Sequence, residues 1–289
     1  MIRQIIFLSS LIFLLLTDQI HATIIVVVST YDGFIVAADS RMTISTPSGK
    51  RIASDSNQKI FRIGHSSALT FSGAAFLFDL NNQKRNIGSL VENFKIKRKI
   101  TDTTSISPAN IAEDFKSFLE LIYNKQKLNV KEGQLHIRIV GYDQDKNRRI
   151  FEIKLPNIEK VGIDSINVYG TIQELYPSGT PASLVQGQTD AWHRIVKGYD
   201  PKLLKMDLSQ EFKDKLNNLR YDIRYDLMSM QDALDFAVFI VRATIEAQRF
   251  DQDAVMGVGG AIDVALVTPD GFRWIQNKKL NVEGKEFDY

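Results

Sequence analysis

The stretch "IHATIIVVVS", residues 20–29, places Thr23 after the small residue Ala22 and at the start of a β-branched run. If the chain is cut after Ala22, Thr23 carries a free α-amine beside its own hydroxyl. A threonine hydroxyl is a weak nucleophile until a base accepts its proton. An α-amine has an ordinary pKa of about 7.7–8.0 and is a usable base near neutrality, whereas an internal amide nitrogen is not. Cleavage after Ala22 would therefore create a catalytic group.

Three further residues are candidates for the same site. An amine base needs positive charge nearby, and a buried lysine supplies it when a carboxylate keeps that lysine charged. Asp39 ends the second expected strand and Lys59 opens the third, so both can point back toward Thr23. Acyl transfer also needs a backbone N–H donor for the oxyanion, and Gly73, after the strand "ALTFS", is the candidate.

Each of these residues also has a structural interpretation. Thr23 could be an ordinary strand threonine, Asp39 a turn cap and Lys59 a surface residue. Gly73 could mark a bend between a strand and a helix. The set of four beside an expected cleavage point favours the catalytic interpretation.

The elements that would position these residues begin with a hairpin. Strands are expected at 24–29 and 34–38 around the turn Asp32-Gly33, and the apolar run indicates burial on both faces. Further expected elements are strands at 59–63 and 68–71, a helix within 76–94, a helix from Pro108 capped by Ser107, strands from Leu135 and at 150–155, a helix around 191–196, a helix at 229–249 capped by Ser229, and a hairpin turning at Pro269-Asp270-Gly271.

The order of strands, helices, strands, helices and strands predicts an α+β fold, a four-layer αββα sandwich. Residues 156–228 are the least regular part, and two or more short helices are expected there. In the long helix at 229–249, the apolar stripe is expected at Leu234, Val238, Val241 and Ile245.

The first 22 residues have the three parts of a secretory signal peptide. Arg3 gives a positive start, residues 5–16 are an apolar run, and the polar stretch "TDQIHA" ends in Ala22. The alternative is an uncleaved membrane anchor, but the apolar run is short for a span. We therefore expect a signal peptide at 1–22, one domain at 23–289, a periplasmic or secreted location, and no membrane span after leader removal.

Composition argues against several other functions. The formal net charge is only +2, and no basic stripe is interleaved with aromatic residues, so nucleic acid is not an expected partner. The chain has no cysteine, which excludes thiolate nucleophiles, thiolate zinc sites and disulfides. His65, His136 and His193 lack metal-ligand spacing, so neither a metal nor a cofactor is expected.

"TIIVVVSTYDGFIVAADSR", "IASDSNQKIFRI" and "ALTFSGAA" together resemble the catalytic β-subunits of proteasomes and their bacterial relatives, which are N-terminal nucleophile hydrolases. The resemblance is close over residues 23–76 and looser over 229–276. It implies that Thr23 is the nucleophile, that Asp39 orients Lys59, that Lys59 tunes the pKa values, and that Gly73 donates to the oxyanion. It also implies a supporting role for Arg41 and a substrate-binding set of Met42, Thr43, Asn57, Phe71 and Ala75.

Two features depart from the family pattern. The family carries a serine beside the nucleophile, where this chain has Gln186 or Gln188 in "VQGQTDAW". The family also has a late aspartate before paired glycines, a place that either Asp251 or Asp253 could fill.

The resemblance thus predicts an exported threonine peptidase that acts on peptides or unfolded chains and forms a homo-oligomer. Two alternatives stay open: an acylase for non-peptide amides on the same fold, and a non-catalytic subunit of a proteasome-like ring.

Overall fold

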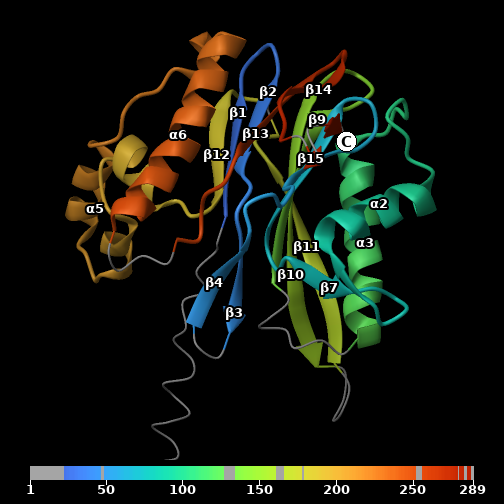
Figure 1. Ribbon diagram of the computed structural model, residues 1–289. Coiled ribbons are helices and arrows are strands. Elements are labelled where there is room, and N and C mark those ends of the chain that lie inside the picture. The colour runs from blue at the N-terminus through green and yellow to red at the C-terminus, as the bar shows by residue number, and fades with distance from the viewer. Residues whose placement is uncertain are drawn as a thin grey trace, which may run out of the picture.

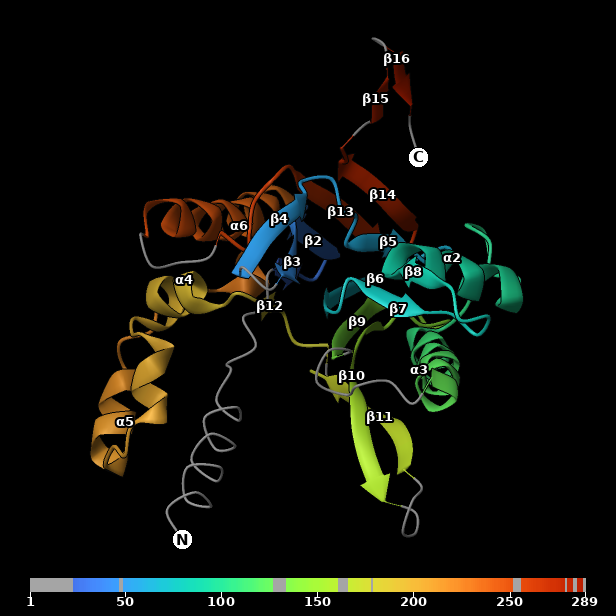
Figure 2. The ribbon, with the colours of Figure 1, turned by 60° about the horizontal axis from the view of Figure 1, so that its bottom comes forward.

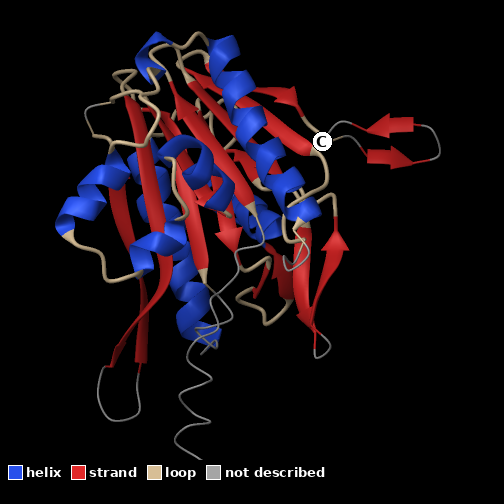
Figure 3. Cartoon of the chain, turned by 90° about the vertical axis from the view of Figure 1, so that its left-hand side faces the viewer, coloured by secondary structure: helices blue, strands red, loops and turns tan. Residues whose placement is uncertain are grey.

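The computed structural model of the chain describes residues 23–46, 49–126, 134–160, 166–177, 179–251, 256–278, 280–282 and 285–287. Two five-stranded sheets pack face to face, and helices cover the outer face of each sheet (Figures 1 and 3). The predicted four-layer αββα sandwich is therefore confirmed. Residues 1–22, where a signal peptide is expected, lie outside the described residues.

The first sheet has the order β12-β1-β2-β13-β14. Its strands are β1 (Ile24–Ser29), β2 (Phe34–Asp39), β12 (Ala182–Gly187), β13 (Ile262–Thr268) and β14 (Gly271–Gln276). All of its strand pairs are antiparallel. The tight turn between β1 and β2 is closed by the Thr30 N–H, which donates to the Gly33 carbonyl at 2.9 Å.

The second sheet has the order β11-β10-β9-β6-β5 and is also antiparallel. Its strands are β5 (Ile60–Arg62), β6 (Ser67–Gly73), β9 (Leu135–Tyr142), β10 (Arg148–Lys160) and β11 (Ile166–Leu175). Three small strand pairs lie outside the sheets: β3 (Met42–Thr46) with β4 (Gly49–Ser54), β7 (Phe76–Phe78) with β8 (Lys84–Asn86), and β15 (Leu280–Val282) with β16 (Lys285–Phe287). The last pair projects beyond β14 (Figure 2).

Helices α2 (Ile87–Arg98) and α3 (Pro108–Gln126) cover the second sheet, and α6 (Met230–Phe250) covers the first (Figure 1). The segment between β12 and α6 holds α4 (Asp190–Trp192), the π-helix η1 (His193–Lys197), the 3-10 helices η2 (Pro201–Lys205) and η3 (Tyr225–Leu227), and α5 (Gln210–Asn217). None of the helices in the described part of the chain combines the length and hydropathy needed to cross a membrane.

Three apolar clusters separate the four layers. One lies between α2, α3 and the second sheet, one between the two sheets, and one between the first sheet and α6. β1 and β2 are buried along their whole length because they contribute to two of these clusters. The apolar runs of the first hairpin are therefore explained by burial on both faces.

Several local predictions are confirmed. α3 begins at Pro108, and α6 begins after Ser229, whose side chain forms a reciprocal capping box with Asp232. The hairpin at Pro269-Asp270-Gly271 joins β13 to β14. The apolar stripe of α6 is displaced from the predicted one: Val241 is fully buried, but the rest of the buried face is Ala233, Ala237, Ile240 and Thr244. Leu234, Val238 and Ile245 pack at the edge of that cluster.

Three other predictions are wrong in detail. The strand expected to begin at Lys59 begins at Ile60, and it is the fifth strand because β3 and β4 form a hairpin before it. The helix expected within 76–94 begins only at Ile87, because β7 and β8 pair first. The region 156–228 contains the end of β10 and all of β11 and β12, besides the short helices that were expected there. β11 was missed because Val168 is the one buried residue among those of its residues whose burial is described, and β7 and β8 because they pair only with each other, outside the two main sheets.

Candidate active site

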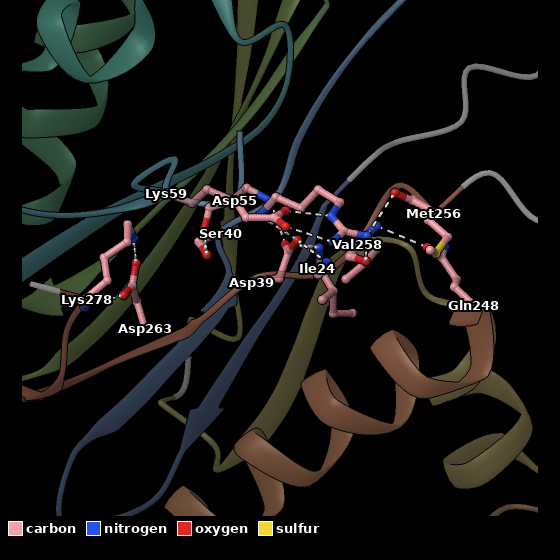
Figure 4. A network of polar contacts seen from close by, with 12 residues as sticks. Ile24, Asp39, Ser40, Asp55, Lys59, Gln248, Met256, Val258, Asp263 and Lys278 are labelled. Atoms are coloured by element: carbon pink, nitrogen blue, oxygen red, sulfur yellow. Dashed lines mark hydrogen bonds and ion pairs between the residues drawn. The ribbon is translucent and has the colours of Figure 1, made fainter. Parts of the chain in front are cut away.

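The carboxylate of Asp39 is the centre of the site (Figure 4). Asp39 ends β2 and is fully buried. Its Oδ1 accepts the Ile24 backbone N–H at 2.9 Å and a bond from Lys59 Nζ at 2.6 Å. Its Oδ2 accepts the backbone N–H groups of Gly259 at 3.0 Å and Arg41 at 3.2 Å. A buried carboxylate is stable as an anion when it is bonded in this way.

Lys59 is also almost completely buried, with 2% of its surface exposed. Burial lowers the pKa of its ammonium, since an apolar environment disfavours charge. The attraction and hydrogen bond of Asp39 act in the opposite direction and raise that pKa. The pair thus holds a positive charge inside the protein at the start of β1.

Thr23 lies directly beside this pair in the chain. It is 7% exposed and precedes Ile24, whose N–H is bound by Asp39. On its other side Thr23 lies against the end of β12. The Gln188 N–H, directly after β12, donates to the Thr23 carbonyl at 2.6 Å. Gly187 has a φ of +89°, and a Cβ there would lie 1.9 Å from the Thr23 carbonyl oxygen. Only glycine lets β12 approach Thr23 this closely.

Gly73 is the last residue of β6 and is exposed. Its φ is +108°, and a Cβ at this position would lie 2.1 Å from the Gln134 carbonyl oxygen. Both facts require glycine at this strand end. The alternative interpretation of Gly73, as a bend between a strand and a helix, is wrong, because β7 follows.

Gln186 connects the strand beside Thr23 to the strand that carries Gly73. It lies on β12 opposite Ile25 of β1 and is 3% exposed. Its Nε2 donates to Ser72 Oγ at 2.9 Å and to the His136 carbonyl at 2.5 Å. The side chain at this position therefore joins the two sheets next to the site, a contact for which the sequence has no local signal.

Arg41 contributes to the network through its backbone N–H, which donates to Asp39, and through its guanidinium. Its guanidinium makes a two-point ion pair with Asp55, at 2.6 and 2.9 Å, and donates to the carbonyls of Met256 and Val258 at 3.5 and 3.4 Å. The hydrogen bonds from Arg41 lower the pKa of Asp55. Arg41 thus fixes the loop that presents the Gly259 N–H to Asp39. Asp55 was missed because nothing in its neighbourhood distinguishes it from a loop aspartate.

The proposed substrate-binding residues occupy different environments. Met42 and Thr43 begin β3, and the Asn57 N–H donates to the Ser40 carbonyl at 2.8 Å. Phe71 is only 4% exposed and stacks on Phe61 in the core beneath α2 and α3. The Ala75 carbonyl accepts the Ile87 N–H at 3.1 Å, at the start of α2.

The structure describes one of the two candidate late aspartates. Asp251 is the exposed residue that follows α6. Asp253 lies outside the described residues. Among the residues that are described, no group of three or more His, Cys, Asp or Glu side chains is arranged to hold a metal ion.

Thr23 directly before β1, a buried lysine-aspartate pair beside it and the strand end at Gly73 form one connected arrangement. Residues 20–156 match the model of the proteasome subunit family. The matched stretch contains Thr23, Asp39, Lys59 and Gly73, and it supports a proteasome-like N-terminal nucleophile hydrolase at the level of the family. Subunits of that family typically form oligomeric rings. None of the curated protein sequences compared with this chain matches it significantly.

Proposed function

We propose that the chain is an exported, threonine-type N-terminal nucleophile hydrolase that cleaves peptide bonds and is activated when its leader is removed before Thr23. The observation that carries this proposal is the position of Asp39 Oδ1. It bonds both Lys59 Nζ, at 2.6 Å, and the N–H of the residue that follows Thr23, at 2.9 Å. A buried cation is therefore fixed at the one place where a new α-amine and a hydroxyl would appear together.

The proposed reaction uses only groups of the chain and water. Thr23 Oγ attacks the scissile carbonyl carbon, and the α-amine of Thr23 accepts the hydroxyl proton. The Lys59 ammonium favours the neutral amine and stabilises the developing alkoxide, because positive charge nearby lowers both pKa values. The Gly73 N–H donates to the oxyanion of the tetrahedral intermediate.

The intermediate then collapses with loss of the amine product. The α-ammonium returns its proton to the leaving nitrogen, and an ester links the acyl group to Thr23 Oγ. Water attacks this ester with the α-amine as base, which releases the carboxylic acid and restores Thr23. Deacylation thus follows the steps of acylation in reverse, with water in the place of the amine.

The proposed substrates are peptides and unfolded chains, and the proposed assembly is a homo-oligomer. Export would place the enzyme where ATP is absent, so a partner that unfolds proteins with ATP is not part of the proposal. Met42, Thr43, Asn57, Phe71 and Ala75 stay proposed substrate contacts, and Arg41, Asp251 and Asp253 stay proposed supporting residues of the site.

The test is hydrolysis by mature protein that begins at Thr23. Peptides and N-acyl amides are supplied as separate panels, and Thr23→Ala is compared with Thr189→Ala, whose side chain makes no capping bond to α4. Peptide cleavage that is lost only in Thr23→Ala supports the proposal. Cleavage confined to N-acyl amides would identify an acylase, and no cleavage of either panel would favour a non-catalytic subunit.

A further inference from the structure

A second buried ion pair lies close to Lys59. Asp263, on β13, is fully buried. Its carboxylate accepts the Lys278 backbone N–H at 3.0 Å and forms an ion pair with Lys278 Nζ. Lys278 lies beyond β14, so the C-terminal part of the chain is bound into the core by two contacts. Figure 4 shows this pair beside the Asp39 network.

Strand register places Asp263 on the side from which Lys59 enters. Asp263 lies opposite Ala38 of β2. Residues directly opposite share one face of the sheet, and Ala38 belongs to the core between the two sheets. Lys59 comes from the second sheet, directly before β5, and its ammonium ends at Asp39, the residue after Ala38. The Lys59 side chain therefore reaches Asp39 from the face of the first sheet that also carries Asp263.

The charged groups around Lys59 come from several elements. Asp39 lies on β2, Asp55 between β4 and β5, Asp263 on β13, and Lys278 after β14. Burial has the largest effect and lowers the Lys59 pKa, the charges of Asp39 and Asp263 raise it, and the charge of Lys278 lowers it. The Asp263–Lys278 pair has no net charge, so its two effects on Lys59 oppose one another. If the charge of one residue is removed, the effect of the other residue on the Lys59 pKa is no longer compensated.

We propose that Asp263 and Lys278 are positioning residues that set the charge of the Lys59 ammonium, with Lys278 balancing the Asp263 carboxylate. For its catalytic consequence this inference rests on the proposed function, because Lys59 acts there on the amine and hydroxyl of Thr23. The pair itself can be tested without any substrate. Sequence alone does not suggest it, since Asp263 lies in a strand and Lys278 in the segment that follows the last sheet strand.

The direct experiment is an NMR titration of the lysine side chains in the full-length chain. The Lys59 signal is assigned by its absence in Lys59→Arg. Lys278→Met leaves Asp263 unbalanced, so the pKa of Lys59 is expected to rise. Adding Asp263→Asn in the same chain removes both charges and is expected to reverse that rise. Lys278→Arg keeps the charge and is expected to match the unaltered chain. Lys215→Met, at a side chain 70% exposed, is the control without effect.

An unchanged Lys59 titration in Lys278→Met, or a change that Asp263→Asn does not reverse, would overturn the inference. If Lys278→Met does not fold, Asp263→Asn alone serves the same purpose. It leaves the Lys278 charge unbalanced and is expected to lower the Lys59 pKa, so no change there also overturns the inference.

Hydrolysis gives a second readout. In Lys278→Met the unbalanced Asp263 carboxylate favours the charged form of nearby amines, so the acidic limb of the pH–rate profile is expected to move to higher pH. A structural defect alone would lower the rate without moving the limb. If the unaltered chain hydrolyses nothing, the proposed function fails, whereas the lysine titration still decides the role of Asp263 and Lys278.

Discussion

Asp39 and Lys59, 20 residues apart in sequence, form a salt bridge of 2.6 Å in which both side chains are at most 2% exposed. Such a pair is costly to break, because removing one partner leaves an uncompensated buried charge. Its position at the first peptide N–H of β1 explains why so deep an ion pair would be kept. Lys59 is held beside Thr23, where the proposed mechanism requires its charge.

Lys59→Met is expected to reduce hydrolysis by ~10²–10⁴-fold, the range for loss of a group that acts on proton transfer. The reason is that neither the amine nor the hydroxyl of Thr23 would then have a lowered pKa. Steady-state kinetics of the mature protein measure this. Lys154→Met, at a half-exposed side chain on β10, is the matched control. Equal rates in the two variants would contradict the role of Lys59.

Gly73→Ala is expected to reduce kcat by ~10²–10³-fold, as removal of an oxyanion donor does. The added Cβ would lie 2.1 Å from the Gln134 carbonyl, so the end of β6 must move. Gly49→Ala is the control, because Gly49 also has a positive φ, +114°, but nothing lies within 4 Å of its Cβ position. Similar kcat values for the two variants would argue against an oxyanion role.

Gln186→Leu is expected to lower the free energy of unfolding by ~1–3 kcal/mol, the cost of leaving buried polar groups unpaired. The bonds lost are those that Gln186 Nε2 donates to Ser72 Oγ and to the His136 carbonyl. Urea unfolding measures the change, and Gln173→Leu on the exposed face of β11 is the control. Because Ser72 precedes Gly73, kcat should fall as well. If Gln186→Leu is as stable and as active as Gln173→Leu, the bonds of Gln186 between the two sheets are dispensable.

The lowered pKa of Lys59 makes stability depend on pH. Between that lowered value and the ordinary value of 10.5, the unfolded chain binds a proton at Lys59 that the folded chain does not. Stability contributed by this group therefore rises with pH across that window. The reference is Asp39→Asn/Lys59→Met, which removes both charges. The slope of unfolding free energy against pH should be steeper in the unaltered chain. Equal slopes would contradict burial as the main effect on Lys59.

Local sequence signals predicted the parts of the fold that depend on neighbours in the chain. Ser229 and Asp232 cap α6, Pro108 begins α3, and the Asp32-Gly33 turn closes the first hairpin, because each effect acts within a few residues. The β3–β4 hairpin was not predicted, since "TISTPSGKR" has no apolar alternation.

The candidate site was predictable only where a motif marked it. Thr23, Asp39, Lys59 and Gly73 stand in a recognisable order, and the structure joins Asp39 to Lys59 directly. The contacts of Gly259 with Asp39 and of Lys278 with Asp263 bridge separations that no local pattern encodes. The cross-sheet bonds of Gln186 likewise depend on the packing of one sheet on the other.

The most direct test of the account is the intact mass and N-terminal sequence of the protein recovered from the export compartment. We predict a terminus at Thr23, because only that cut gives the hydroxyl beside Asp39 and Lys59 an α-amine of its own. A retained leader, or a cut at any other residue, would leave Thr23 without that amine and would contradict the account.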